Sequence, residues 1–319
     1  MPTSLTLGTN NAIPTDYPVL NNTIVDANHG TPFPTSATFW NGANWAVLFT
    51  NPAATVNKVT IDLGSSNDTL TINTAIIGDS SLPAGHNDQA KLRLGGGNDS
   101  LTINSYVERY RILGGGGNDT VIINEATPAA TVNKVTIDLG TGNDTLTVNA
   151  AIIGDISLSA SNINQAKLQL GGGNDSLTIN SYVERYRILG GVGNDTIIIN
   201  EATATTAVDV NNSIINLGAG ADFLQIDADL LGVKIIAGTT NSEGVDTIII
   251  RESGSGVNIS NFSITSDEDI LILGGTQFSG ADYSGPTGTF NSSLNLSGTG
   301  AAIDAVNAWL DNGNTLILI

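Results

Sequence analysis

The strongest constraint on the fold of this chain is an internal duplication with an offset of 76 residues. Ala54–Asp79 returns nearly unchanged as Ala130–Asp155, and Gln89–Thr127 returns as Gln165–Thr203. Each copy contains alternating apolar strands on both sides of a Gly-rich Asn-Asp turn, and the turn Asp recurs at intervals of 20 to 31 residues. Recurring turn-strand units of this length are typical of stacked coils. The repeat therefore predicts an all-β parallel β-solenoid of the β-helix or β-roll type.

The strand after each turn alternates polar and apolar residues, the period that places successive side chains on opposite faces. Leu70 and Ile72 are expected to point inward, and Thr69 and Thr71 outward. Stacking then builds one inner column from Leu70, Leu101, Val121, Leu146, Leu177, Ile197, Leu224 and Ile248. A second inner column holds Ile72, Ile103, Ile123, Val148, Ile179, Ile199, Ile226 and Ile250. Asn residues at the strand ends are expected to hydrogen-bond between coils; they are Asn73, Asn104, Asn124, Asn149, Asn180 and Asn200.

The repeat divides the chain into three segments. Residues 1–54 show no turn motif and read as an aromatic cap or docking segment. Residues 55–252 are predicted to form about eight rungs of a right-handed solenoid. Residues 253–319 are predicted to form a small cap with a helix at Ala301–Leu310, and they are also the candidate type I secretion signal. Caps are expected because the last rung of a solenoid otherwise exposes an open sheet edge.

Composition limits the possible chemistry. With 30 acidic and 11 basic residues, the formal net charge is −19, which disfavours nucleic-acid partners and anionic membranes. The chain is nevertheless 40% hydrophobic, so the acidic residues are expected on a folded scaffold. It has no Cys and only two His, which removes disulfides and thiolate sites and leaves little histidine chemistry. No segment approaches the ~20 apolar residues of a membrane span, and we expect no membrane insertion.

Two turns carry the most specific motif. Gly114–Ile122 (GGGGNDTVI) and Gly190–Ile198 (GGVGNDTII) match the nonapeptide G-G-x-G-x-D-x-U-x at every defined position, where U is apolar. Glycines permit positive φ, and Asp supplies the hard oxygen that Ca²⁺ prefers. Here the chain resembles the RTX, or haemolysin-type, calcium-binding repeat family. Asn258–Leu273 is similar to the degenerate segment that often follows such arrays, and it fits a terminal hairpin equally well.

The resemblance implies Ca²⁺ as cofactor, bound in one row along one edge of the solenoid. It also implies secretion by a type I system without a cleaved signal peptide, and folding outside the cell. The alternative is ordinary turn chemistry, with each Asp accepting local backbone N–H bonds and no metal. Occupancy is least expected at the first and last turns, whose glycine patterns depart from the motif. The candidate metal-site residues are Asp68, Asp99, Gly114, Gly116, Asp119, Asp144, Asp175, Gly190, Asp195, Asp222 and Asp246.

The sequence favours an extracellular structural protein without enzymatic activity, a subunit of a surface layer, filament or adhesive matrix. Self-association is expected, and a surface polysaccharide is a possible partner. Candidate contact residues are the aromatic flank Phe39, Trp40, Trp45 and Phe49, and the duplicated cluster residues Tyr106, Arg109, Tyr182 and Arg185. A calcium-dependent carbohydrate- or ice-binding adhesin is the first alternative, since outward Thr pairs could order water. A polysaccharide-modifying β-helix enzyme is the second, although a duplicated cluster argues against a single asymmetric active site.

Overall fold

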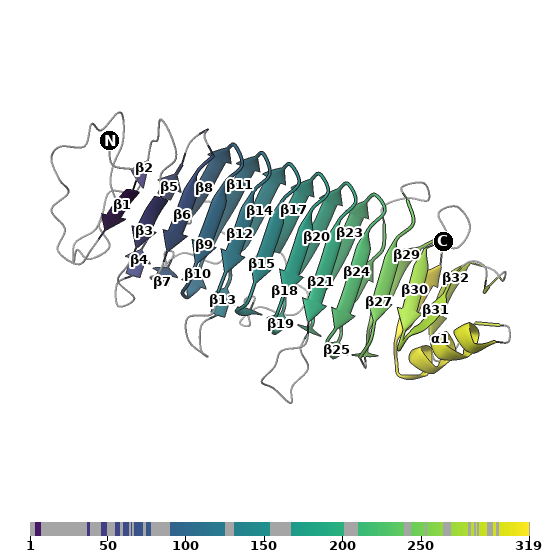
Figure 1. Cartoon of the computed structure of the whole chain (residues 1–319). Coiled ribbons are helices and arrows are strands. Elements are labelled where there is room, and N and C mark those ends of the chain that lie inside the picture. The colour runs from purple at the N-terminus through teal and green to yellow at the C-terminus, as the bar shows by residue number, and fades with distance from the viewer. Residues whose placement is uncertain are drawn as a thin grey trace.

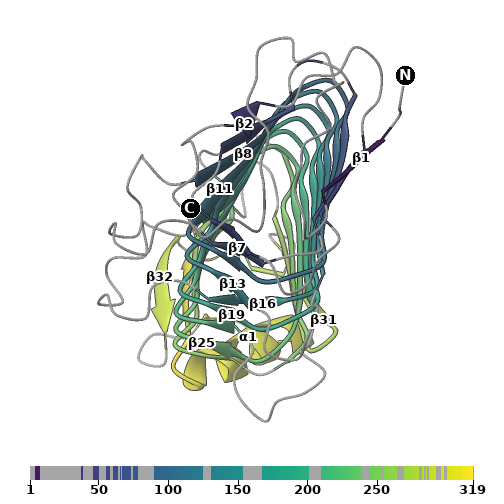
Figure 2. The same ribbon diagram turned by 90° about the vertical axis from the view of Figure 1, so that its left-hand side faces the viewer.

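The computed structural model shows a parallel β-solenoid with three sheets running along a rod (Figure 1). It describes strand segments 4–7, 37–38, 46–49 and 55–57, and residues 60–318 except 64, 66, 73–74, 78–89, 125–130, 154–166, 201–209, 239–243, 253, 264–268, 280–281, 284, 286, 292–295 and 298–299. Seen along the rod, two long sheets meet at a tight turn, and a shorter third sheet joins them at the other side (Figure 2). The predicted fold class is confirmed.

Each rung passes through sheet B, the Gly-Asn-Asp turn, sheet A and sheet C, in that order. Sheet A contains, in spatial order, β1 (Ser4–Leu7), β3 (Ala46–Phe49), β6 (Thr69–Ile72), β9 (Ser100–Ile103), β12 (Thr120–Ile123), β15 (Thr145–Val148), β18 (Ser176–Ile179), β21 (Thr196–Asn200), β24 (Phe223–Asp227), β27 (Thr247–Ile250), β30 (Ile270–Leu273) and β31 (Thr276–Phe278). Apart from the last, these strands pair in parallel.

Sheets B and C complete each rung. Sheet B contains β2 (Ala37–Thr38), β5 (Thr60–Asp62), β8 (Ala90–Gly96), β11 (Tyr110–Gly116), β14 (Thr136–Thr141), β17 (Lys167–Gly172), β20 (Arg187–Val192), β23 (Ile214–Ala219), β26 (Lys234–Ile236), β29 (Asn258–Phe262), β33 (Thr315–Leu318) and β32 (Gly288–Asn291). Sheet C contains the short strands β4 (Thr55–Asn57), β7 (Ala75–Ile77), β10 (Val107–Glu108), β13 (Thr131–Asn133), β16 (Ala151–Ile153), β19 (Val183–Glu184), β22 (Val210–Asn211), β25 (Leu230–Leu231) and β28 (Gly254–Ser255).

The core consists of the apolar columns that the alternation predicts. Leu70 pairs with Leu101, which pairs with Val121, and the column continues to Ile248 with every member buried. The column from Ile72 to Ile250 is equally buried. Parallel strands in strict register stack like residues at the strand spacing of about 4.8 Å, which builds a continuous apolar interior.

The Asn column is confirmed over the described residues. The Nδ2 of Asn124 donates to Oδ1 of Asn104, and Asn149 donates to Asn124, each at 2.8 Å. Asn180 and Asn200 extend the same ladder. Asn73 lies outside the described residues. The ladder satisfies side-chain amides at the corner between sheets A and C, where the backbone leaves its strand.

The sheets extend beyond residues 55–252 at both ends. In residues 1–54, β1 and β3 continue sheet A, and β2 pairs with β5. At the other end β28, β29 and β30 form a further rung. Because β29 and β30 belong to different sheets, the hairpin interpretation of Asn258–Leu273 is wrong. The right-handed sense stays a prediction.

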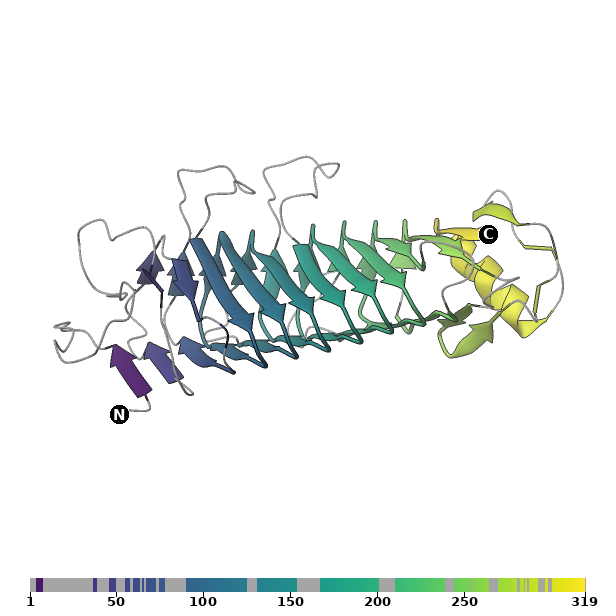
Figure 3. The same ribbon diagram turned by 90° about the horizontal axis from the view of Figure 1, so that it is seen from above.

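The carboxyl-terminal end is covered by a compact cap. Strands β31 and β32 pair in the antiparallel sense with β30 and β33. The predicted helix is confirmed as α1 (Ala301–Asp311), which lies at this end of the rod (Figure 3). Its buried face packs beside an aromatic row that runs through Phe262, Phe278, Tyr283 and Phe290. The cap closes the exposed edge of the last rungs. No helix in the described part of the chain is long and apolar enough to cross a membrane.

Candidate metal-binding turns

Two glycine columns shape the turn between sheets B and A. The inner column has Gly115, Gly140 and their equivalents at positive φ, and the outer column has Gly117, Gly142 and theirs. A Cβ at these positions would overlap a backbone carbonyl of the neighbouring rung. The residue between the two glycines points outward, and at Gly172 nothing lies within 4 Å of a built Cβ. This turn conformation therefore favours glycine at the first and third positions of Gly-x-Gly, whereas the middle position accommodates a side chain.

The turn Asp side chains point inward and form a continuous ladder. The amide N–H of Asp99 donates to Oδ1 of Asp119 at 2.9 Å, and that of Asp119 donates to Oδ1 of Asp144 at 2.7 Å. The pattern runs through every described turn from Asp68 to Asp269. Each ladder Asp exposes 3% or less of its surface. One oxygen of each carboxylate thus serves the backbone of the preceding rung.

The Asn residues before the Asp form a second ladder in the opposite sense. The amide N–H of Asn118 donates to Oδ1 of Asn98, and that of Asn143 donates to Oδ1 of Asn118, each at 2.8 Å. Asp side chains accept from the preceding rung, whereas Asn side chains accept from the following one. Both members of the Asn-Asp pair therefore accept hydrogen bonds from backbone amides of adjacent turns. Side chains that accept backbone N–H bonds are what the metal-free interpretation of these turns predicts.

The second carboxylate oxygen has a different environment. Oδ2 of seven ladder residues is buried without a hydrogen-bond partner: Asp68, Asp99, Asp119, Asp144, Asp175, Asp195 and Asp222. Burial, with a smaller contribution from neighbouring ladder carboxylates, raises the pKa of Asp119 to about 6 and the pKa values of Asp144 and Asp195 to about 7. Burial also raises the pKa values of Asp99 and Asp175. A buried oxygen of this kind calls for a proton or a cation.

Two turns have glycine at an inward position that is Leu in most of the other turns and Ala237 before Asp246. The inward position before the turn is Leu in most rungs: Leu63, Leu94, Leu139, Leu170 and Leu217 are buried. The strand register places Gly114 between Leu94 and Leu139, and Gly190 between Leu170 and Leu217. These two glycines are the first residues of the two complete nonapeptides, so the motif replaces an apolar side chain with a bare backbone that neighbouring oxygen atoms approach closely.

Oxygen atoms converge on these two glycines. A Cβ on Gly114 would overlap the carbonyl oxygen of Leu139 and lie 2.7 Å from Oδ2 of Asp119. A Cβ on Gly190 would overlap the carbonyl oxygen of Leu217 and lie 2.8 Å from Oδ2 of Asp195. A buried carboxylate oxygen beside a backbone carbonyl is the donor chemistry that Ca²⁺ takes.

Calcium therefore fits two of the eight predicted turns best. At the turns of Asp99, Asp144 and Asp175 the inward Leu occupies the corresponding position. No group of three His, Cys, Asp or Glu side chains that could hold a metal occurs in the described residues. A bound ion would draw mainly on backbone carbonyls, with Asp119 or Asp195 supplying charge, and would link adjacent rungs by neutralising that charge.

The remaining predicted metal-site residues take other places. Gly116 is the outward residue of its turn, and its carbonyl accepts the amide of Gly97 at 2.8 Å. Asp68, Asp222 and Asp246 belong to the ladder. Sequence reasoning missed Asp269, which continues the ladder by accepting the amide of Asp246 at 2.9 Å. The residue before it is Glu268 and no glycine run precedes it, so the turn motif gives no signal there.

The predicted contact residues are described only in part. Phe39, Trp40 and Trp45 lie outside the described residues, as does the side chain of Phe49 in β3. The duplicated cluster is a corner between sheets C and B.

In this corner Tyr106 donates to Glu108 at 2.7 Å, and Arg109 pairs with Glu108 at 3.4 Å. The second copy repeats the arrangement, with Tyr182 and Arg185 on Glu184. Arg109 and Arg185 adopt positive φ. The geometry matches a tight corner with Glu–Arg pairing.

The fold and these turns define a parallel β-solenoid with a buried Asp ladder. No protein-family model matches the sequence, and neither does any curated protein. A search of solved structures finds a hyperactive, Ca²⁺-dependent, β-helical antifreeze protein from an Antarctic bacterium. The match has 19% identity and a TM-score of 0.32, and covers 78% of this chain and 91% of the other. Likeness at this level carries no functional argument.

Proposed function

We propose that the protein is an extracellular structural or adhesive rod, without enzymatic activity, stiffened by Ca²⁺ at two internal turns. The observation that carries this proposal is the replacement of the inward Leu by Gly114 and Gly190, which brings a backbone carbonyl oxygen and the buried Oδ2 of Asp119 or Asp195 close to each glycine. Both sites lie in the rod itself, three rungs apart. Occupied turns would therefore brace the solenoid along its length.

The rod architecture supports the structural half of the proposal. Nearly all side chains in the interior serve the apolar columns or the ladders. The strand register repeats the outward positions from rung to rung, and repeated surfaces of this kind suit extended contacts with a partner or with other copies. The polar cluster at Tyr106 and Tyr182 is explained by corner geometry. An extracellular location would supply the calcium that the two turns require.

The metal half is tested with charge-neutralising variants. Asp119→Asn combined with Asp195→Asn keeps an oxygen for the ladder and removes the anionic oxygen beside each glycine. The matched control, Asp99→Asn with Asp175→Asn, makes the same change at turns whose inward residue is Leu94 or Leu170. Unfolding temperatures are measured at pH 8 with chelator and with millimolar CaCl₂.

We expect calcium to raise the unfolding temperature of the native chain and of the control pair. The Asp119/Asp195 pair is expected to lose this response while remaining folded. If calcium stabilises neither the native chain nor the control pair, the metal half of the proposal is wrong. If both double variants lose the calcium-induced rise in unfolding temperature equally, calcium binding is not specific to the turns of Asp119 and Asp195.

The structural role has its own measurement. Sedimentation of the full chain with calcium at high protein concentration should reveal species larger than a monomer. A chain that stays monomeric under all such conditions contradicts a lattice or filament subunit and leaves a soluble binding module.

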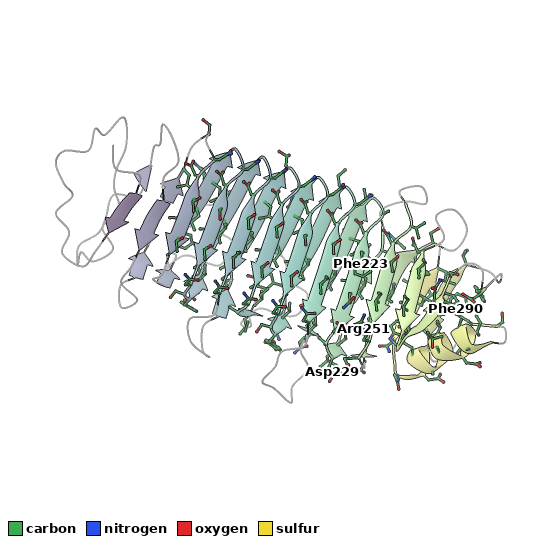
Figure 4. The ribbon with its side chains drawn as sticks, viewed as in Figure 1. Phe223, Asp229, Arg251 and Phe290 are labelled. Atoms are coloured by element: carbon green, nitrogen blue, oxygen red, sulfur yellow. The ribbon has the colours of Figure 1, made fainter. Side chains whose placement is uncertain are left out.

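Ice binding is a second candidate, favoured by one feature of sheet A. Six successive rungs present a hydroxyl side chain at the first outward position: Thr69, Ser100, Thr120, Thr145, Ser176 and Thr196. The row ends at Phe223, labelled in Figure 4. The second row contains Ile122 and Ile198 among threonines.

Thermal hysteresis of the native chain tests this candidate. Thr145→Lys with Thr147→Lys should abolish it, whereas Thr136→Lys with Gln169→Lys on sheet B should leave it unchanged. A native chain without measurable hysteresis removes ice binding from consideration.

A further inference from the structure

The charges of this acidic chain are segregated between its faces. Nine of its 30 acidic residues are the buried ladder Asp residues. All charged residues other than these nine together carry a formal charge of −10, whereas the whole chain carries −19. The 11 basic residues are not spread evenly over the rod. Six of them point outward from sheet B: Lys91, Arg93, Arg111, Lys167, Arg187 and Lys234. We call this set the basic stripe.

The strand register aligns the basic stripe. Lys91 is the direct neighbour of Arg111, and Lys167 is the direct neighbour of Arg187. Thr136 lies between the two pairs, and Lys234 continues the same row beyond Ile214. The row follows the rod because strict register stacks the strands side by side along it (Figure 1).

Acidic neighbours are scarce on this face. Among outward residues of sheet B whose side chains are described, only Asp138 is acidic. Among these described side chains, six are cationic and one is anionic, in a chain where acids outnumber bases by almost three to one. Asp62 of β5, opposite Arg93 in the strand register, lies outside the described side chains. Like charges directly opposite each other in a sheet are unfavourable. Two such pairs, three rungs or about 14 Å apart, indicate a surface arranged for an anionic partner.

We propose that the basic stripe binds an acidic polysaccharide lying along the rod. A linear polyanion matches a straight row of cations, and Arg guanidinium groups suit carboxylate or sulfate groups. Neutral side chains within the face, including Thr136, Gln169 and Asn216, offer donors and acceptors for sugar hydroxyls. The Nζ of Lys167 is held against the face by Oε1 of Gln169 at 2.7 Å.

A polysaccharide fits this face better than a nucleic acid. Proteins that grip single strands usually stack bases on aromatic rings, and the described outward residues of sheet B include none. The acidic remainder of the surface would repel a densely charged duplex. The inference goes beyond the structural role and does not require calcium at the turns.

The test measures the affinity for dextran sulfate, with uncharged dextran as the matched neutral polymer, in chelator and over a range of salt concentrations. The neutralised variant carries Lys91→Gln, Arg111→Gln, Lys167→Gln and Arg187→Gln. The charge-preserving control carries Lys91→Arg, Arg111→Lys, Lys167→Arg and Arg187→Lys. Circular dichroism verifies that both variants keep the β-solenoid.

We expect salt-sensitive binding of dextran sulfate by the native chain and the charge-preserving control, and no binding of dextran. The neutralised variant should bind about tenfold more weakly or worse, with a shallower salt dependence. Unchanged binding by the neutralised variant, or equal binding of dextran, would overturn the proposal. Tighter binding of single-stranded DNA than of dextran sulfate would overturn it in favour of a nucleic-acid partner. All binding measurements are made in chelator, so their outcome does not depend on whether the turns bind calcium. A wrong proposal for the basic stripe is therefore distinguishable from a wrong proposal for the calcium sites.

Discussion

The amide N–H of Asp119 donates to Oδ1 of Asp144, the matching carboxylate of the next rung, at 2.7 Å. The two residues are 25 positions apart in the chain, yet they are joined as directly as neighbours in a turn. Through this bond the turn Asp satisfies a backbone amide of the adjacent rung, whether or not a metal is present. Only its second oxygen, buried without a hydrogen-bond partner, is left for further chemistry.

The hydrogen bond accepted by Oδ1 of Asp144 predicts a difference between two substitutions. Asp144→Asn and Asp144→Ala both remove the buried charge, but only Asn keeps an acceptor for the Asp119 amide. We expect the Asn variant to be more stable than the Ala variant by about 1–3 kcal/mol in urea unfolding with chelator. Equal stabilities would show that the ladder hydrogen bond contributes nothing.

The raised pKa values predict the pH dependence of the metal-free protein. Asp144 and Asp195 have pKa values of about 7 in the folded chain against 3.8 for an unperturbed Asp. Between roughly pH 4 and pH 7 the folded state thus binds more protons than the unfolded state. Stability in chelator should fall as pH rises through this window and level off above it.

Calcium should oppose this trend. The ion competes with protons for the same oxygens, so its stabilising effect is expected to be small at pH 5 and large at pH 8. Thermal unfolding across this range, with and without CaCl₂, provides the measurement. A metal-free protein that gains stability between pH 5 and pH 7 would contradict the burial of ionised ladder carboxylates.

Much of this architecture could be predicted because its signals are local and repeated. The alternation around Leu70 and Ile72 fixes the inner columns, and the repeated Asn at strand ends fixes the ladder through Asn124 and Asn149. Sheet C could not be read in the same way. Strands of two or three residues, such as β10 and β16, are too short to show a period.

The row of Asp turns was predicted from the sequence, but the differences between individual turns in their inward residue were not. The sequence indicates a row of similar Asp turns, because Gly-x-Gly-Asn-Asp recurs in most of them. Gly114 and Leu139 hold the same inward position, but only the strand register reveals it. The direction of each carboxylate likewise depends on the turn conformation, which a composition of Gly, Asn and Asp leaves open.

The glycine columns predict a sharp positional contrast. Gly142 has φ +130, and a Cβ there would overlap the carbonyl oxygen of Gly117. Gly172 has nothing within 4 Å of a built Cβ, and Thr141 and Val192 occupy the same position in other rungs. We expect Gly142→Ala to cost about 2 kcal/mol or more, and Gly172→Ala less than about 0.5 kcal/mol. Chemical unfolding of the two variants measures both; similar costs would contradict the described turn.

A buried hydroxyl predicts a further difference between tyrosines. The Tyr186 hydroxyl accepts the amide of Val135 at 3.0 Å and donates to its carbonyl at 2.8 Å, 51 residues away. Tyr186→Phe leaves both backbone groups without this partner and should cost about 1–3 kcal/mol. Tyr182→Phe, at a partly exposed corner, should cost less. A larger loss for Tyr182→Phe in the same unfolding assay would contradict this interior contact.

The central claim, that calcium occupies two turns defined by Gly114 and Gly190, is tested most directly by counting ions. Isothermal titration of chelator-treated protein at pH 8 should give about two tight sites per chain. Asp119→Asn should remove one of them, and Asp119→Asn with Asp195→Asn should remove both. A stoichiometry close to the number of Asp turns would contradict the account, because every turn would then bind regardless of its inward residue. The absence of binding would likewise contradict it and leave the Asp ladder as turn chemistry alone.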